Sequence, residues 1–282
     1  MIRLNYQRRY KNIRRKILKD LFLITGATGG MGYEAAKHFI TKGEVLLLDI
    51  NEDLLIKVKN ELGDNASYLK FDITNQNDID AVVNFVKKKK GFKYLLHFAG
   101  VSESMGNSEL IYKINIVGSI NLLNQLYDYI LPNGAVINTS SITAHQTPFS
   151  NEVGEILANP SDPDFLNKIL PLTETTSQAY GWSKRALLNF NEASVSKFGL
   201  KQARIISISP GAIKTPMVEK EMEKNKDAIL GLINITPVKR IGLPSDIVNL
   251  VEFLISDHAS FITGIDIIID GGVTSALKYM KH

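Results

Sequence analysis

The most chemically suggestive stretch of the chain is YGWSK, in which Tyr180 and Lys184 stand four residues apart. On a helix, residues at this spacing share one face, so the phenol and the ammonium can point toward the same small volume. A free phenol has a pKa of about 10, and a nearby cation lowers that pKa toward neutrality. The pair is therefore suited to exchange a proton with an oxygen that gains or loses charge. A helix with one packed tyrosine and one solvated lysine is the plainer alternative.

A glycine-rich segment offers a second piece of chemistry. In LFLITGATGGMG, residues 21–32, an apolar run leads into Gly26, Gly29, Gly30 and Gly32. Glycine permits backbone conformations and close approaches that a Cβ would block. A strand-to-helix turn of this kind presents backbone N–H groups to a dinucleotide pyrophosphate. No Lys followed by Ser or Thr belongs to the turn, which argues against a nucleoside triphosphate loop. A purely structural tight turn is the alternative.

An acid follows the glycine turn at an informative distance. Asp49 lies near the end of EVLLLDI, 23 positions beyond Gly26. An acid at this spacing accepts hydrogen bonds from the adenosine ribose and would repel a 2′-phosphate. Asp49 therefore favours NAD over NADP, although an ordinary solvated acid at a strand end would look the same.

The periodicity of the chain predicts the scaffold that positions these residues. Seven apolar runs are short enough for buried strands: LFLIT, EVLLLDI, SYLKFDI, KYLLHFAG, AVINTSS, ARIISISP and IDIIID. Between most of them apolar residues recur at helical spacing, as at Ile79, Val82, Val83 and Val86. This alternation predicts an α/β fold with a Rossmann-like, doubly wound, parallel seven-stranded sheet and helices on both faces. Residues 21–282 are expected to form one domain.

Composition narrows the setting and the partners. The 282 residues contain no cysteine, which excludes disulfides and thiolate metal sites and favours a cytoplasmic protein. Scattered histidines predict no metal site, and no stretch approaches the length of a membrane span. Eight Lys/Arg and one acid fall in residues 1–20, so the rest of a chain of net charge +4 carries −3. Residues 1–20 are therefore expected to form a basic extension, which is solvated, packs at a subunit edge or contacts an anionic surface. Because the rest of the chain is acidic, nucleic-acid binding is not expected.

In their order along the chain, these segments resemble the short-chain dehydrogenase/reductase family over almost all of residues 21–275. The motifs that carry the resemblance are TGATGGMG, FDIT, the AG of HFAG, INIVG, NTSS, YGWSK, SPGAIKTPM and IDGG. The glycine turn fits the spacing of both the compact and the extended branch, whereas the length and the closing IIIDGG resemble the compact branch. One departure is His97-Phe98, where the family often shows two asparagines. The sequence therefore does not show which polar side chains stabilise the fourth strand.

The resemblance implies roles for particular residues. Tyr180 is implied to be the general acid/base and Lys184 its electrostatic partner, which also holds the nicotinamide ribose. Ser141, in preference to Ser140, is implied to hydrogen-bond the substrate oxygen, and Asn115 to hold a water in a proton relay to Lys184. The other cofactor contacts that the resemblance implies are Gly26, Thr28, Gly29, Gly30, Met31, Gly32, Asp49, Ile50, Asp72, Ile73, Ala99, Gly100, Pro210, Gly211, Ile213 and Thr215.

The expected activity is hydride transfer between NAD(H) and a carbonyl or secondary alcohol, with NADP the less favoured cofactor. The segment before Tyr180 and the tail IIIDGGVTSALKYM look most like the 3α-hydroxysteroid dehydrogenase/carbonyl reductase group, which implies a steroid or another bulky apolar ketone. Two alternatives stay open: a nucleotide-sugar epimerase or dehydratase, and a nicotinamide-binding sensor without turnover. A homo-oligomer, dimer or tetramer, is expected.

The catalytic Ser and Tyr are separated by an insertion, residues 142–179, longer than in many compact family members. It contains four prolines around DFLNKIL, which predicts a short helix from about Asp164. One hypothesis makes it a lid whose apolar residues, among them Phe149, Phe165 and Leu166, line the site. The other has it obstruct the helix starting near Tyr180, through which family members often pair. A surface excursion without function is the third possibility.

Overall fold

Every predicted apolar run forms a strand of one parallel sheet. The structure is a computed structural model that describes residues 19–215 and 226–279. Within these residues the strands are β1 (Leu21–Thr25), β2 (Glu44–Asp49), β3 (Ala66–Lys70), β4 (Phe92–His97), β5 (Ile130–Thr139), β6 (Arg204–Pro210) and β7 (Asp266–Ile269). Their order across the sheet is β3-β2-β1-β4-β5-β6-β7, and all neighbouring pairs are parallel. The predicted seven-stranded, doubly wound α/β fold is confirmed.

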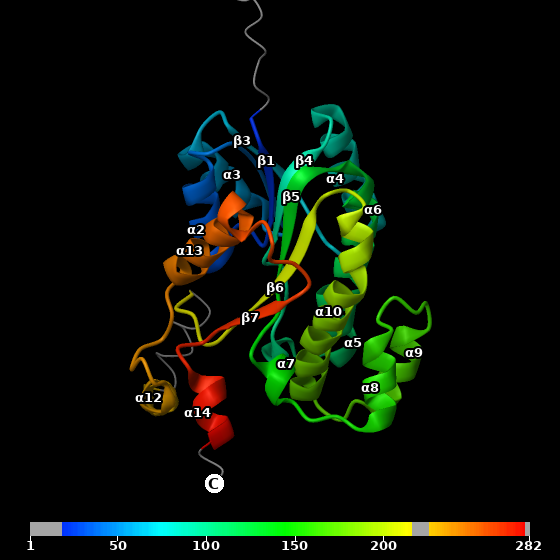
Figure 1. Ribbon diagram of the computed structural model, residues 1–282, viewed down its shortest axis with the longest axis vertical. Helices are drawn as coiled ribbons and strands as arrows, with labels where there is room; N and C mark the ends of the chain where they lie inside the picture. Colours follow the sequence, from blue (N-terminus) through cyan, green and yellow to red (C-terminus); the bar gives the residue numbers. More distant parts are fainter. Residues whose placement is uncertain (1–18, 216–225, 280–282) are drawn as a thin grey trace, which may run out of the picture.

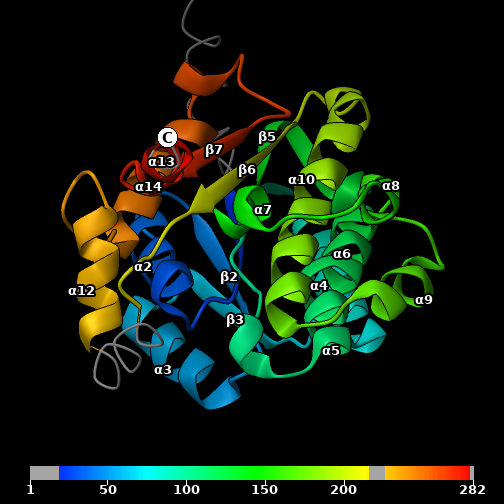
Figure 2. The same ribbon diagram turned by 90° about the horizontal axis from the view of Figure 1, so that it is seen from below.

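Helices cover both faces of the sheet, as the views in Figures 1 and 2 show. One face carries α2 (Gly30–Phe39), α3 (Glu52–Leu62) and α13 (Pro244–Ile255). The other carries α4 (Gln76–Lys89), α6 (Ser119–Leu126) and α10 (Thr176–Gly199). Three other helices, α5 (Ser108–Tyr112), α12 (Lys226–Ile235) and α14 (Val273–Tyr279), lie near the carboxyl edge of the sheet.

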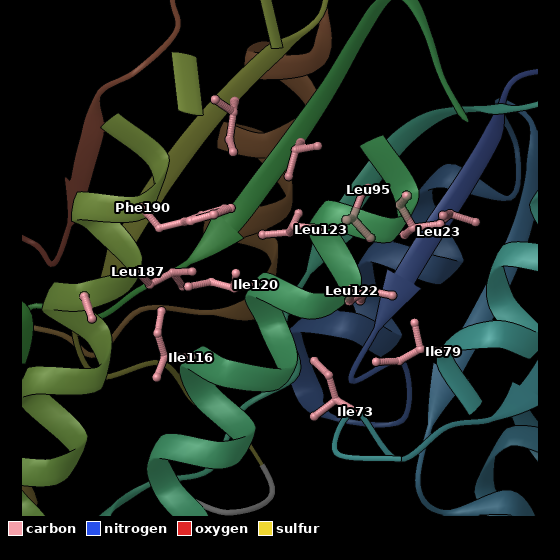
Figure 3. Close-up of a cluster of buried hydrophobic side chains, with 14 of the residues drawn as sticks. Leu23, Ile73, Ile79, Leu95, Ile116, Ile120, Leu122, Leu123, Leu187 and Phe190 are labelled. Carbon is pink, nitrogen blue, oxygen red and sulfur yellow. The ribbon is translucent and has the colours of Figure 1, made fainter. Parts of the chain in front are cut away.

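Burial on both faces explains the nearly continuous apolar runs of the strands. In β1, Leu23 packs toward α4 and α6, whereas Phe22 and Ile24 pack on the opposite face. Figure 3 shows the first of these two cores, in which Leu23 and Leu95 of the sheet meet Leu122 and Leu123 of α6. Strands buried on both sides need apolar residues at successive positions, so no polar alternation is seen.

The strand order reverses between β1 and β4. The chain runs outward from β1 to β2 and β3, and then returns to build β4 to β7 on the other side of β1. In an open parallel sheet, the connections leaving such a reversal point diverge and open a crevice at the carboxyl ends of the strands. The segments after Thr25, His97, Thr139 and Pro210 all reach this edge, so the fold gathers there the residues singled out in the sequence.

The insertion between Ser141 and Tyr180 is more helical than its prolines suggest. α9 (Phe165–Ile169) begins directly after Asp164, as predicted, but α7 (Thr143–Gln146) and α8 (Asn151–Ala158) were not foreseen. The side chain of Ser150 caps α8 by accepting a hydrogen bond from the backbone of Val153, which starts a helix shortly after the end of α7.

The insertion packs on α5 and α10, and none of the three apolar residues named for a lid lines the two cavities at the carboxyl edge of the sheet. Phe165 is 1% exposed and meets the ring of Tyr112 edge-on at 5.9 Å, while Leu166 packs against the same core. The indole of Trp182 donates to the carbonyl of Pro148 (2.9 Å). Phe149 is 43% exposed, beside Arg185. The face of α10 is thus covered by the chain's own insertion (Figure 2).

The predicted basic extension, residues 1–20, lies outside the described residues except for Lys19 and Asp20. In the part of the chain that the structure describes, no helix is both long enough and apolar enough to cross a membrane.

Candidate active site

The glycine turn needs its glycines for steric reasons. Gly26 has φ +64°, a conformation that side chains rarely adopt, and a Cβ on it would lie 3.0 Å from the backbone nitrogen of Ala99. A Cβ on Gly32 would lie 2.1 Å from the carbonyl oxygen of Gly26. The turn therefore packs backbone against backbone, and no side chain caps α2, which begins at Gly30. Its first N–H groups are left facing the cleft, in the arrangement that binds phosphate.

Asp49 closes the other side of the same turn. Its Oδ2 accepts a hydrogen bond from the backbone nitrogen of Thr28 at 3.0 Å, and its Oδ1 accepts one from that of Asn51 at 3.1 Å. These bonds hold the carboxylate at the end of β2, beside the turn. Each oxygen keeps a further lone pair available for a hydroxyl donor.

Two adjoining cavities form one cleft along the carboxyl edge of the sheet. The first, of about 530 Å³, lies near Asp49, and the second, of about 430 Å³, lies near Tyr180. The predicted cofactor-contact residues that line one or both cavities are Gly26, Thr28, Gly29, Gly30, Met31, Gly32, Asp49, Ile50, Asp72, Ile73, Ala99, Gly100, Tyr180, Lys184, Pro210, Gly211, Ile213 and Thr215. The structure thus brings together all of the residues proposed for cofactor binding, which come from both halves of the chain.

Ser141, Tyr180 and Lys184 converge in the second cavity. α10 is started by a capping box of Thr175 and Gln178, which places Tyr180 and Lys184 one turn apart on the face toward β5. Ser141 and Tyr180 share a side-chain hydrogen bond. The hydroxyl of Ser140 instead donates to the backbone carbonyl of Lys184 (3.0 Å) and is used inside the fold. Ser141 is therefore the serine placed to meet a substrate oxygen.

Burial sets the ionisation of this group. It lowers the pKa of Lys184 to about 8, and the ammonium donates a hydrogen bond to the carbonyl of Thr139 at 3.0 Å. Burial also raises the pKa of Tyr180, opposed by the hydrogen bond with Ser141, and the carboxylate of Glu103 raises it further. The expectation that Lys184 brings the Tyr180 pKa toward neutrality is therefore not met by the protein residues alone, because the desolvation of the phenol outweighs other effects.

Asn115 lies behind the cleft rather than on its wall. It sits in a π-helical segment, Lys113–Gly118, between α5 and α6. Its amide bonds both backbone groups of Val101, accepting from the nitrogen and donating to the carbonyl at 2.9 Å each. A Cβ on Gly100 would lie 3.1 Å from Asn115 Oδ1 and 3.1 Å from Lys184 Nζ. Glycine at this position leaves the space between the two polar atoms open, as a bridging water requires.

The cleft fits a nicotinamide dinucleotide on observations of its own. Among the described residues, the Thr139 hydroxyl is buried in the wall of the second cavity and has no hydrogen-bond partner. Buried polar groups are rarely left so, which indicates that a ligand or water satisfies it. The described residues contain no group of three or more acidic or histidine side chains able to hold a metal ion.

One buried polar group below this cleft was not among the residues predicted to be functional. His97, noted only as a departure from a motif, hydrogen-bonds Thr25 and Ser119 in the interior. The signal that could have found it is the combination of a polar residue at the end of a buried strand with hydroxyl residues at the ends of two neighbouring elements.

Comparison with known proteins places this cleft in a family context. A family model described as short chain dehydrogenase matches residues 20–153, and one described as Enoyl-(Acyl carrier protein) reductase matches residues 172–274. The short-chain dehydrogenase/reductase bsc3 of Alternaria brassicicola is 32% identical over 275 residues, covering 94% of this chain and 98% of that protein. Residues 154–171, between the two family matches, belong to the insertion.

Two further proteins are similar to the chain over most of its length. Cyclohexanol dehydrogenase of Acinetobacter sp. strain SE19 is 28% identical over 283 residues, covering 92% of this chain and 99% of that protein. The solved structure of ElxO with NADP bound has a TM-score of 0.73 at 23% identity, covering 91% of this chain and 99% of that one, and shares the fold.

Proposed function

The chain belongs to the short-chain dehydrogenase/reductase family, whose members are oxidoreductases acting on alcohols or carbonyls with NAD or NADP, and we propose that it is an NAD(H)-dependent carbonyl reductase or secondary-alcohol dehydrogenase. The observation that carries the proposal is the convergence of Ser141, Tyr180 and Lys184 on the cavity beyond the glycine turn. A sensor without turnover would have no need of this combination.

In the proposed mechanism, the residues lining the two cavities would hold a nicotinamide dinucleotide, which would provide the hydride chemistry when bound. Ser141 hydrogen-bonds the substrate oxygen and stabilises the charge that develops on it. The Tyr180 hydroxyl gives its proton to that oxygen during reduction and takes one back during oxidation. The Lys184 ammonium, held near the ring of Tyr180 at 5.8 Å from the ring centre, stabilises the phenolate that this transfer leaves. Asn115 and the open space at Gly100 supply the path by which a water returns the proton.

The preference for NAD over NADP rests on Asp49. A 2′-phosphate on the adenosine ribose would meet its fixed carboxylate, and no arginine or lysine lines the described walls of the first cavity to offset the repulsion. A lining that lacks a cation favours the free ribose diol, which can donate hydrogen bonds to Asp49.

The proposed substrate is a bulky apolar ketone or its alcohol, including a cyclic or steroid-like one. Phe98, Val101 and Ala212, which are not among the expected cofactor contacts, line the second cavity together with Tyr180, and these apolar side chains support an apolar substrate. The similarity to a cyclohexanol dehydrogenase supports a ring-bearing substrate.

A nicotinamide absorbance assay tests the activity. We expect NADH oxidation with cyclohexanone and larger ring ketones, and NAD reduction with the matching alcohols. Tyr180→Phe serves as the matched control, because it keeps the ring and removes only the hydroxyl. Binding of NADH without turnover of any ketone or alcohol in the panel would contradict the proposal and favour the sensor.

The oligomer that we propose is a dimer that does not use α10. The insertion covers the side of α10 at Trp182, while the sheet ends in β7, which pairs only with β6 within the described residues. Along this edge Ile265 and Ile268 are 46% and 40% exposed. Light scattering of a variant with residues 146–174 replaced by a Gly/Ser linker tests the idea, with Ile268→Lys as the matched disruption of the edge. If the linker variant has the same molar mass per particle as the unmodified protein, the insertion does not determine which surface forms the dimer.

A further inference from the structure

Three buried polar side chains meet beneath the floor of the cleft. Thr25 ends β1, His97 ends β4 and Ser119 begins α6, and none is more than 1% exposed. The Thr25 Oγ1 atom lies 2.7 Å from His97 Nδ1, and His97 Nε2 lies 2.8 Å from Ser119 Oγ. The imidazole therefore joins the two central strands of the sheet to a helix on one face.

The surrounding hydrogen bonds determine the direction of each contact. Thr25 Oγ1 accepts from the backbone nitrogen of Ala99 at 3.1 Å, so its one hydroxyl proton is free for His97 Nδ1. Ser119 donates its proton to the carbonyl of Ile114 at 3.2 Å, so its oxygen accepts from Nε2–H. Only the neutral imidazole protonated at Nε2 uses every donor. The other tautomer and the imidazolium would both leave the Thr25 proton without an acceptor among these groups.

Both ends of this chain of hydrogen bonds reach the catalytic surroundings. At one end, Ala99 directly precedes Gly100. At the other, the carbonyl of Ile114 belongs to the peptide that leads into Asn115. Because Asn115 bonds both backbone groups of Val101, the bonds close into a circuit around Gly100. This circuit surrounds the open space beside Gly100, where a Cβ would lie 3.1 Å from both Asn115 Oδ1 and Lys184 Nζ.

We propose that His97 is a positioning residue which, as the neutral Nε2–H tautomer, fixes the spacing between the Ala99–Val101 backbone and the π-helical turn of Asn115. It thereby keeps open the gap between Asn115 and Lys184 through which a water relays the proton. This proposal rests on the proposed function, since the gap matters only where Tyr180 turns over protons.

Electrostatics supports a neutral ring. Burial lowers the pKa of His97 to about 3, and the positive charge of Lys184, on α10, contributes to the same shift. Near neutral pH the imidazole is therefore uncharged, and it keeps one acceptor for Thr25 and one donor for Ser119.

Nitrogen-15 NMR of the imidazole tests the tautomer directly. We expect His97 to show a protonated Nε2 and an unprotonated Nδ1, with no change between about pH 5.5 and 9. An Nδ1–H tautomer, or a midpoint within that range, would overturn the assignment.

Three variants test positioning. His97→Leu removes both hydrogen bonds, His97→Gln supplies one donor and one acceptor, and Asn191→Leu is the matched control. Asn191 is a buried polar residue of α10 that bonds Asn138 and Ser207 and lines neither cavity of the cleft. We expect His97→Leu to lower kcat by at least about tenfold while the Kd for NADH changes by less than about threefold, with kcat largely restored by glutamine. If Asn191→Leu lowers kcat by the same factor at equal thermal stability, His97 has only a structural role and the proposal is wrong.

Amide NMR separates this proposal from the proposed function. Without any substrate, His97→Leu should shift the backbone amides of Ala99 and Val101 and the side-chain amide of Asn115, and Asn191→Leu should leave them in place. If no ketone is turned over but these shifts occur, the proposed function fails and the positioning stands. If turnover is normal and the three signals do not move, the positioning fails alone.

Discussion

The cofactor cleft and the insertion between Ser141 and Tyr180 are built by different means. In the cleft, polar atoms are held by backbone: Asp49 by two amides and Lys184 by the carbonyl of Thr139. The insertion is held by apolar burial, with Val153, Leu157, Phe165 and Ile169 set into the core beside α10. The first kind of contact demands one residue type at one place, whereas the second accepts many side chains of suitable volume.

This difference predicts a separation of effects. Changes in the cleft should alter catalysis or cofactor choice with little loss of stability, and changes in the insertion should do the reverse.

The largest expected effect is on turnover in Tyr180→Phe. The variant removes the proton donor but keeps the ring, which packs against the core. We expect kcat to fall by roughly two to four orders of magnitude, the usual range for a general acid, with NADH affinity nearly unchanged. Stopped-flow absorbance and NADH fluorescence titration measure the two quantities. Turnover within a few-fold of the unmodified protein would make Tyr180 a packing residue.

The next effect is on stability, in Phe165→Ala. Removing a fully buried ring that meets Tyr112 edge-on should lower the free energy of unfolding by about 3 kcal/mol. Phe149→Ala is the matched control, because that ring is 43% exposed and should cost much less. Urea unfolding gives both values. A fall in kcat/KM for ring ketones in Phe165→Ala at a temperature where it is folded would restore the insertion to the substrate site.

The same difference explains what could be foreseen from the sequence. The order of strands and the place of the glycine turn follow from local requirements: apolar runs buried on both faces, and steric needs such as that of Gly32, where a Cβ would lie 2.1 Å from the Gly26 carbonyl oxygen. α7 and α8 could not be foreseen, because helices of four and eight residues are too short to show a clear helical periodicity and their partners lie on α10. The His97 contacts join three elements that are distant in the chain, and the raised pKa of Tyr180 depends on a burial that no motif encodes.

A third variant, Lys184→Met, should lose turnover yet gain stability. The folded pKa of about 8 lies below the ordinary 10.5, so between these pH values the unfolded chain binds more protons. The free energy of unfolding contributed by Lys184 therefore rises with pH through this window, and below about pH 8 the buried charge costs up to about 3 kcal/mol.

Part of that gain is offset, since the Thr139 carbonyl loses its hydrogen bond, and a net gain of about 1 to 2 kcal/mol at pH 7 is expected. The gain should disappear by about pH 10.5, where the unmodified lysine is neutral in the folded state. Lys197→Met, on the same helix but solvent-facing, is the matched control. Chemical unfolding at about pH 7 and about pH 10 measures the difference. A Lys184→Met variant that is less stable than the unmodified protein at neutral pH would contradict the sign.

The smallest expected effect is the most specific, and it concerns Asp49→Ala. The unmodified protein should bind NADH more tightly than NADPH, because its fixed carboxylate accepts from a ribose diol and repels a 2′-phosphate. The alanine removes both effects, so the ratio of the two Kd values should shrink by about tenfold, equivalent to about 1.4 kcal/mol. Asp53→Asn, in the first turn of α3, removes a nearby negative charge without touching the turn and should leave the ratio nearly unchanged. Fluorescence titration of the three proteins with both cofactors gives the six Kd values. Equal affinities in the unmodified protein would refute the assignment of Asp49, and an equal response in Asp53→Asn would show that net charge at this end of the cleft, not the position of one carboxylate, sets the preference.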